Sequence, residues 1–215
     1  AWLQGISLNI SRGLPQPYGG FSRIQVDNQG RMEVKELGIM PKAAPDDQEC
    51  FHIWNHYGTT ERIRRHCQAV CRQAEKLAER LDVSGHKSDR QIIRSGALLH
   101  DVVRGEKDHG KKGAYILRRE GYPAVAEVIR RHHDLECPKK PGEPLWLETA
   151  VVYLADKQVE EDQAVSLDKR FADSRKRCEA SENPQAAVAA HERRYRQAKE
   201  IEKIIQMYID GGQGI

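Results

Sequence analysis

The chain has 215 residues, which suits one substantial domain or one domain with an appendage. Its residues are 39% hydrophobic and 31% charged, no apolar run approaches the roughly 20 residues that span a bilayer, and no segment resembles a secretory signal. The net charge is only +3, and aromatic residues that stack on nucleic-acid bases do not alternate with the basic ones. These features exclude a membrane-spanning protein, disfavour nucleic-acid binding, and predict a soluble, cytoplasmic protein.

The first 45 residues are rich in Gly and Pro and differ from the rest of the chain. Residues 21–26 and 32–37 alternate partly between apolar and polar side chains, and the turn-forming sequence 27–30 separates them, so we expect a β-hairpin. Two strands alone are barely stable, so this hairpin must pack on the main body, on a partner chain or on a missing domain. We therefore predict an N-terminal extension, residues 1–45, and a helical bundle, residues 46–215.

From residue 48 onward the pattern predicts helices. Apolar residues recur at helical spacing over 63–81, and Thr59 or Thr60 can cap this helix. Further helices are expected to begin at Ser88 or Asp89, Asp108, Pro123, Leu145 and Pro184. The five cysteines (Cys50, Cys67, Cys71, Cys137 and Cys178) contain no C-x-x-C pair and are interpreted as reduced thiols. The sequence thus predicts an all-α fold with a small β extension.

Two aspartates stand at the ends of apolar runs. Asp101 follows Gly96-Ala97-Leu98-Leu99-His100, and Asp156 follows Val151-Val152-Tyr153-Leu154-Ala155. An unpaired buried charge is costly, so each needs a partner. Two buried salt bridges would explain both acids, and so would a metal ion that they share.

Histidines accompany the two acids along the chain. His66, His100, His109 and His132 are candidate ligands, although His66 and His132 taken singly are more often hydrogen-bonded core residues. His133 is about 100° from His132 on a helix, so we expect it to face the substrate or to support a ligand. Imidazole and carboxylate groups together suit Fe, Mn, Zn or Ni better than Ca or Mg. A metal centre accounts for the histidines as well as the acids.

The motifs Thr60-Glu61-Arg62-Ile63-Arg64-Arg65-His66, Leu98-Leu99-His100-Asp101, His109, His132-His133 and Leu154-Ala155-Asp156-Lys157 occur in this order. Together they resemble the HD (HDIG-type) metal-dependent phosphohydrolase superfamily, over roughly residues 48–165. The resemblance implies an HD-domain helical bundle. It also implies two divalent ions, with Fe or Mn foremost and Zn, Ni, Mg or Co as alternatives.

By the same resemblance, His66, His100, Asp101 and Asp156 would hold the first ion. His109 and His132 would hold the second, with Asp101 as the bridge. Asp101, Arg104 and His133 are the predicted catalytic residues, and Arg104, Lys107 and Lys112 the predicted substrate-binding ones. Arg104 stands where the family often has Lys; it can bind phosphate through two hydrogen bonds but is a poor proton donor.

The leading hypothesis is hydrolysis of a phosphate ester or anhydride by a metal-activated water. The expected partner is an anionic small molecule, a nucleotide or a dinucleoside polyphosphate, and the chain could form a homodimer. Basic pairs around the candidate ligands, such as Arg64-Arg65 and Arg130-Arg131, suit an anionic substrate. Two alternatives use the same fold: a mixed-valent di-iron oxygenase, and a degenerate HD module with a binding or regulatory role.

Overall fold

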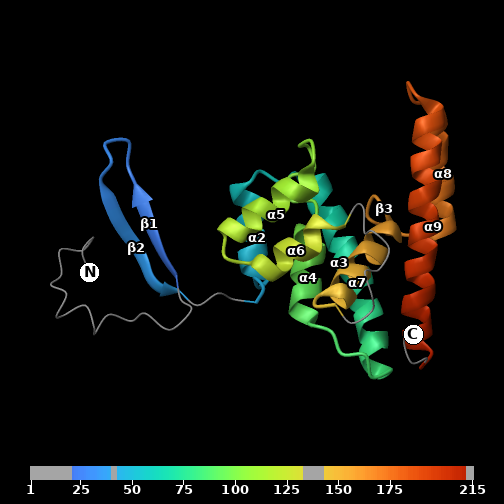
Figure 1. Cartoon of the computed structure of the whole chain (residues 1–215), viewed down its shortest axis with the longest axis horizontal. Helices are drawn as coiled ribbons and strands as arrows, with labels where there is room; N and C mark the ends of the chain where they lie inside the picture. Colours follow the sequence, from blue (N-terminus) through green and yellow to red (C-terminus); the bar gives the residue numbers. More distant parts are fainter. Residues whose placement is uncertain (1–20, 40–42, 133–142, 212–215) are drawn as a thin grey trace. The chain divides into compact units, whose positions relative to one another are not determined.

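The structure, a computed structural model, describes residues 21–39, 43–132 and 143–211. Within these ranges it contains eight helices and four strands (Figure 1). The chain divides into two compact units, residues 1–42 and 43–215.

The first unit contains the predicted hairpin. Strand β1 (Phe21–Val26) pairs antiparallel with β2 (Met32–Ile39), and Val26 lies opposite Met32. The turn is stabilised by Asp27, whose carboxylate accepts hydrogen bonds from the backbone N–H groups of Gln29 and Arg31, each at 2.9 Å. The hairpin prediction is therefore confirmed.

The second unit is built from helices, as the all-α prediction requires. Their bounds are α2 (Asp47–His56), α3 (Glu61–Val83), α4 (Arg90–Leu99), α5 (His109–Arg119), α6 (Pro123–Arg130), α7 (Trp146–Lys157), α8 (Leu167–Glu179) and α9 (Pro184–Ile209). A short hairpin of β3 (Val159–Glu160) and β4 (Gln163–Ala164) connects α7 to α8. None of the helices in the described ranges is both long and apolar enough to cross a membrane.

The predicted helices begin at the expected positions, but not every predicted capping residue makes a capping hydrogen bond. Asp89 caps α4, because its carboxylate accepts hydrogen bonds from the N–H groups of Gln91 and Ile92. Asp108 precedes α5, but its backbone is left-handed (φ 55°) and its side chain makes no capping hydrogen bond. Thr60 likewise precedes α3 without a side-chain cap. At these two positions the helix begins without a hydrogen bond from the capping side chain.

Helices α4 and α7 form the centre of the unit. Helix α4 packs against α2, α3, α6 and α7, and α7 also packs against α9. Apart from its first residues and Arg94, α4 is buried throughout, and so is α7 from Thr149 to Asp156. This enclosure explains why both sequences are apolar over consecutive turns, and both helices end at candidate ligands.

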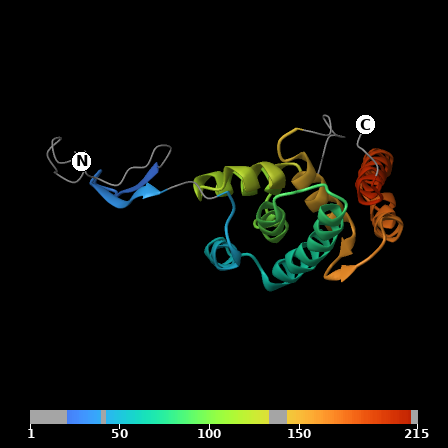
Figure 2. The ribbon, with the colours of Figure 1, turned by 90° about the horizontal axis from the view of Figure 1, so that it is seen from below.

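Helices α8 and α9 form an outer layer. They lie side by side in both views (Figures 1 and 2), and α9 packs on α3 and α7. Phe171 of α8 contacts the rings of His191 and Tyr195 on α9. This packing holds α8 beside the β3–β4 hairpin, and residues of α8 and of the hairpin line the same cavity.

Arg94 ties three helices together. Its guanidinium donates to both carboxylate oxygens of Asp47 on α2, at 2.6 and 2.5 Å, and to Glu75 on α3. The hydrogen bonds from Arg94 lower the pKa of Asp47 below its ordinary value, although partial burial acts in the opposite direction.

We expect Asp47→Asn to lower the free energy of unfolding at neutral pH by about 1 kcal/mol, the scale of a well-oriented ion pair near the surface. The lowered folded-state pKa means that ionised Asp47 stabilises the fold above about pH 4, and that this contribution is lost as the pH falls through the lowered pKa. Urea unfolding of both proteins between neutral pH and about pH 2 measures the difference. A difference in the free energy of unfolding between the two proteins that stays constant or grows as the pH falls would contradict this role.

Candidate metal centre

The turn after α4 carries His100 and Asp101, and two side chains from outside α4 hold it. Trp54 Nε1 donates to the carbonyl of Leu98 at 3.0 Å, and Thr59 Oγ1 donates to the carbonyl of Val102 at 2.8 Å. Both contacts are buried, so they use backbone acceptors that the end of a helix leaves open. The α2 helix and the residues after it thereby fix the position of the two candidate ligands.

Three of the candidate histidines are oriented by backbone carbonyls. The Nδ1 atom of His66 lies 2.6 Å from the carbonyl of Glu161, that of His100 2.8 Å from Ala97, and that of His132 2.6 Å from Ile129. A carbonyl can only accept a hydrogen bond, so each Nδ1 carries a proton, and each Nε2 faces the carboxylate of Asp101 or Asp156. Metal-ligating histidines are typically held in this way.

The first group of facing atoms, called half-site A, comprises His66, His100, Asp101 and Asp156. Asp156 Oδ1 is 3.2 Å from His66 Nε2 and 3.6 Å from His100 Nε2. Asp101 Oδ2 is 3.3 Å from His100 Nε2 and 3.8 Å from His66 Nε2. The two imidazoles therefore lie between the two carboxylates.

The second group, half-site B, comprises Asp101, His109 and His132. Here the other oxygen of the shared carboxylate, Asp101 Oδ1, is 3.1 Å from His109 Nε2 and 3.6 Å from His132 Nε2. One donor atom from each member lies within 4.8 Å of the others, both in this group and in the group of His66, His100 and Asp101. The structure thus brings together all six predicted ligands, with Asp101 in the place expected of a bridge.

The electrostatics of the centre favour cations. Burial raises the pKa of Asp101, but the neighbouring histidines, His100 foremost, together hold it far below its ordinary value. Burial also raises the pKa of Asp156, and Lys157 together with His100 and His66 brings it well below normal. Burial would lower the pKa of His100, yet Asp101 raises it well above its ordinary value. Protons and metal ions therefore compete for the same groups.

Each carboxylate also pairs with a basic side chain. Arg104 contacts Oδ2 of Asp101, and Lys157 Nζ lies 2.6 Å from Oδ2 of Asp156. At Asp156 the other oxygen, Oδ1, faces the histidines, so an ion pair and a metal ion can share this acid. At Asp101, Oδ1 faces half-site B, whereas Oδ2 faces both Arg104 and His100.

The enclosed atoms fit a divalent ion. His100 Nε2 and Asp101 Oδ1 are fully buried and make no hydrogen bond of acceptable geometry within the described residues. Burial of a polar atom costs free energy unless a partner binds that atom. Helices α4, α6 and α7 end within two residues of His100, His132 and Asp156, respectively, and the negative end of a helix dipole favours a nearby cation. Imidazole and carboxylate groups are suitable ligands for divalent transition metals.

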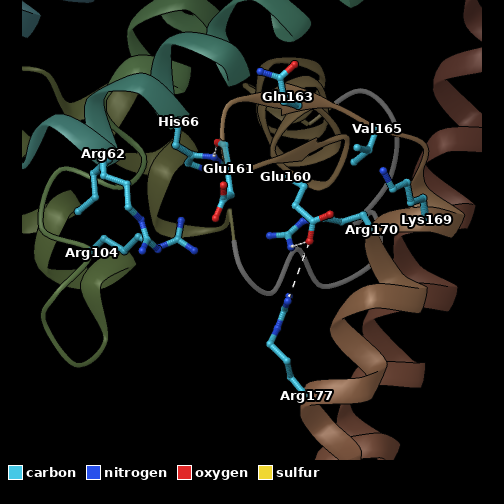
Figure 3. Close-up of a pocket in the computed structure, with 11 residues that line it drawn as sticks. Arg62, His66, Arg104, Glu160, Glu161, Gln163, Val165, Lys169, Arg170 and Arg177 are labelled. Atoms are coloured by element: carbon cyan, nitrogen blue, oxygen red, sulfur yellow. Dashed lines mark hydrogen bonds and ion pairs between the residues drawn. The ribbon is translucent and has the colours of Figure 1, made fainter.

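A cavity of about 620 Å³ opens beside half-site A (Figure 3). His66 and Arg104 line it, and so do Arg62 and residues that the sequence analysis did not single out: Glu160, Glu161, Lys169, Arg170 and Arg177. The missed residues come from β3, the turn after it and α8. The spacing of Arg170 and Arg177, seven residues or two helical turns, was the signal available in the sequence.

The other predicted substrate-binding residues lie elsewhere. Lys112 pairs with Glu106 at 2.6 Å, and neither Lys107 nor Lys112 lines the cavity. Of the basic pairs near the ligands, Arg130 and Arg131 pair with Glu127 on their own helix. His133 lies outside the described residues.

Comparison with known proteins identifies the family. Residues 63–158, which include all six candidate ligands, match the HD domain. The chain is also 31% identical over 123 residues to an uncharacterized protein of Methanocaldococcus jannaschii, a match that covers 51% of this chain and 73% of that protein. The chain belongs to the HD domain family. The resemblance seen in the motifs is thus confirmed at the level of the family.

Two further relatives of this chain are named for a different activity. They are tRNA (cytidine(56)-2'-O)-methyltransferases: one of Picrophilus torridus, 27% identical over 155 residues, and one of Thermoplasma volcanium, 31% identical over 109 residues. The matches cover 65% and 48% of this chain, but only 44% and 31% of the two relatives. The chain therefore spans less than half the length of either methyltransferase. No solved structure matches it.

A glycine allows α5 to approach half-site B. A Cβ atom at Gly110 would lie 3.3 Å from Cε1 and 3.4 Å from Nδ1 of His132. These distances are shorter than ordinary packing contacts, so the imidazole would have to shift by a few tenths of an ångström. The absence of a side chain at Gly110 is thus a condition for the present position of His132.

We expect Gly110→Ala to lower the affinity of half-site B for its metal ion by about 10- to 100-fold, the range seen when a group that supports a ligand is lost. The affinity of half-site A should not change. Metal titration by calorimetry, with metal analysis after gel filtration, measures the two affinities. Gly105→Ala is the matched control, because no atom lies within 4 Å of a Cβ there. Identical titration curves for the two variants would contradict the assignment of His132.

Proposed function

We propose that this HD protein is a metal-dependent phosphohydrolase that cleaves a phosphate ester or anhydride at a binuclear centre. The observation that carries the proposal is the position of Asp101, whose two oxygens face two sets of histidines next to a cationic cavity. Half-site A would hold one ion and half-site B the other. Two such ions supply a water of lowered pKa and neutralise charge on the phosphoryl group.

Arg104 connects the metal centre with the cavity. It contacts Asp101, it lines the cavity, and its side chain is 41% exposed. A guanidinium can bind two phosphate oxygens at once and can stabilise the charge that develops on them. It cannot act as a proton donor at ordinary pH. We therefore assign to Arg104 the orientation of the phosphoryl group and the stabilisation of its charge.

The chemistry of the cavity favours phosphate over a base as the recognised group. Five arginine and lysine side chains line it, and the described lining residues include no Phe, Tyr or Trp on which a base could stack. A nucleotide or dinucleoside polyphosphate would fit through its phosphates, in agreement with the substrate class expected from the family. The methyltransferase name of two relatives describes proteins more than twice as long as the matched segment, so we do not extend that activity to this chain.

A non-catalytic HD module is the second candidate. The ion pairs of Asp101 with Arg104 and of Asp156 with Lys157 support it, because they can neutralise both acids without a metal ion. In that case removal of metal would leave the thermal unfolding temperature unchanged. A phosphohydrolase whose native state binds metal is expected to lose stability when the ion is removed.

The test is metal analysis of the purified protein, followed by a screen of nucleotides and phosphodiesters with Mn²⁺ or Fe²⁺. We expect about two bound ions per chain. Asp101→Ala should lose both ions, and its kcat/KM should fall by more than about 100-fold. Loss of a group that only supports a ligand already costs about 10- to 100-fold, and Asp101 would bind both ions directly. Asp210→Ala, an exposed acid at the end of α9, should behave like the wild type.

Two results would overturn the proposal: a protein that binds no metal under any loading condition, or full activity in Asp101→Ala. Oxygen uptake by the iron-loaded protein together with a mixed-valent EPR signal, and without hydrolysis, would instead indicate the di-iron oxygenase.

A further inference from the structure

The cavity has two cationic ends. Arg62 and Arg104 lie on the side of His66, and α8 supplies Lys169, Arg170 and Arg177 on the opposite side (Figure 3). The carboxylate of Glu160, on β3, lies between them and faces Arg170 and Arg177. One end therefore adjoins the metal centre, and the other is built by residues that follow the segment matched to the HD domain.

The arginines of the α8 end have N–H donors that Glu160 does not satisfy. Arg170 Nη1 is 3.5 Å and Arg177 Nη1 is 4.0 Å from the same atom, Glu160 Oε1. The Nε atom of Arg170 is buried and has no hydrogen-bond acceptor within the described residues. Arg94, by contrast, meets both oxygens of Asp47 at 2.6 and 2.5 Å. The α8 arginines are thus held near one carboxylate without being satisfied by it.

The fold fixes the helix that carries these cations. Ser166 caps α8 by accepting a hydrogen bond from the N–H of Lys169 at 3.2 Å. Leu167 and Phe171 are buried and anchor the helix. Arg170 and Arg177 are two helical turns apart and line the same cavity. The backbone that carries the three cations is thus preformed; the side chain of Arg170 is 21% exposed, whereas Arg177 is 64% exposed and Lys169 is exposed as well.

A substrate that contacts both ends must carry two separate anionic groups. The reacting phosphoryl group belongs at the metal end, beside Arg104. The α8 end then needs a second group that can accept several hydrogen bonds from arginine, and phosphate meets this requirement best. The volume of about 620 Å³ is in the range of small-molecule sites.

We infer that the substrate is a small molecule with at least two phosphate groups, and that Lys169, Arg170 and Arg177 select it by binding the phosphate that does not react. This inference rests on the proposed phosphohydrolase function for the place of the reacting group. Glu160 occupies the arginines when no ligand is bound and competes with the incoming phosphate. The α8 cations are specificity residues, because they touch the substrate away from the reacting atoms.

Binding of inorganic triphosphate to the whole 215-residue chain, stripped of metal, tests the α8 end without any need for turnover. Calorimetry at constant low ionic strength should show that R170Q/R177Q weakens triphosphate binding about tenfold or more, because two charge-assisted contacts are lost. The matched control is R175Q/K176Q, which removes the same charge from α8. Arg175 pairs with Glu179 and Glu192, Lys176 pairs with Asp173, and neither lines the cavity.

Glu160→Gln provides a test in the opposite direction. Removal of the competing carboxylate should strengthen triphosphate binding by about threefold or more, since like charge in the site opposes the anion. A variant that gains affinity cannot be explained by loss of folding. Equal affinity in R170Q/R177Q and R175Q/K176Q, or weaker binding in Glu160→Gln, would overturn the inference.

Steady-state kinetics of the metal-loaded protein test this inference independently of the proposed function. R170Q/R177Q should raise KM for the best diphosphorylated substrate while kcat stays within about twofold of the wild type, because the two arginines do not contact the reacting phosphoryl group. A chain that binds triphosphate as expected but hydrolyses nothing contradicts the proposed function alone. A chain that hydrolyses phosphate compounds with KM unchanged in R170Q/R177Q contradicts the α8 site alone.

Discussion

The hydrogen bonds between histidine Nδ1 atoms and backbone carbonyls are the constraint on which the rest of this structure depends. They fix the ring orientation of His66, His100 and His132, and they direct each Nε2 toward Asp101 or Asp156. Because the acceptors belong to the backbone, the orientation of each ring is set by the course of the main chain: α4 for His100, α6 for His132, and the β3–β4 turn for His66. The carbonyl for His66 comes from Glu161, whose left-handed backbone (φ 53°) belongs to the turn between β3 and β4.

This arrangement explains why the two most enclosed helices end where they do. A charged group in an apolar interior requires compensation. The ends of α4 and α7 supply it through basic partners, imidazoles and the negative end of the helix dipole. The same ends lie next to the cavity that leads to α8. Ligand positioning and access for an anion are thus consequences of one packing arrangement.

Much of the centre could be predicted from the sequence because its signals are local. Asp101 and Asp156 follow apolar runs, and a buried acid at such a position requires a partner. The α8 cations and the supporting contacts of Trp54 and Thr59 could not be predicted, because their roles arise only when distant segments pack together. Spacing alone did not distinguish Lys112, which pairs with Glu106, from a residue that faces the site.

The most direct test of the central claim is a crystal structure of the metal-loaded chain with anomalous scattering recorded at the absorption edge of the bound metal. The account predicts two peaks on either side of Asp101. One should lie about 2 Å from Nε2 of His66 and of His100, and the other at a similar distance from Nε2 of His109 and of His132. A single peak that does not touch Asp101, or ligation through Nδ1, would contradict the account.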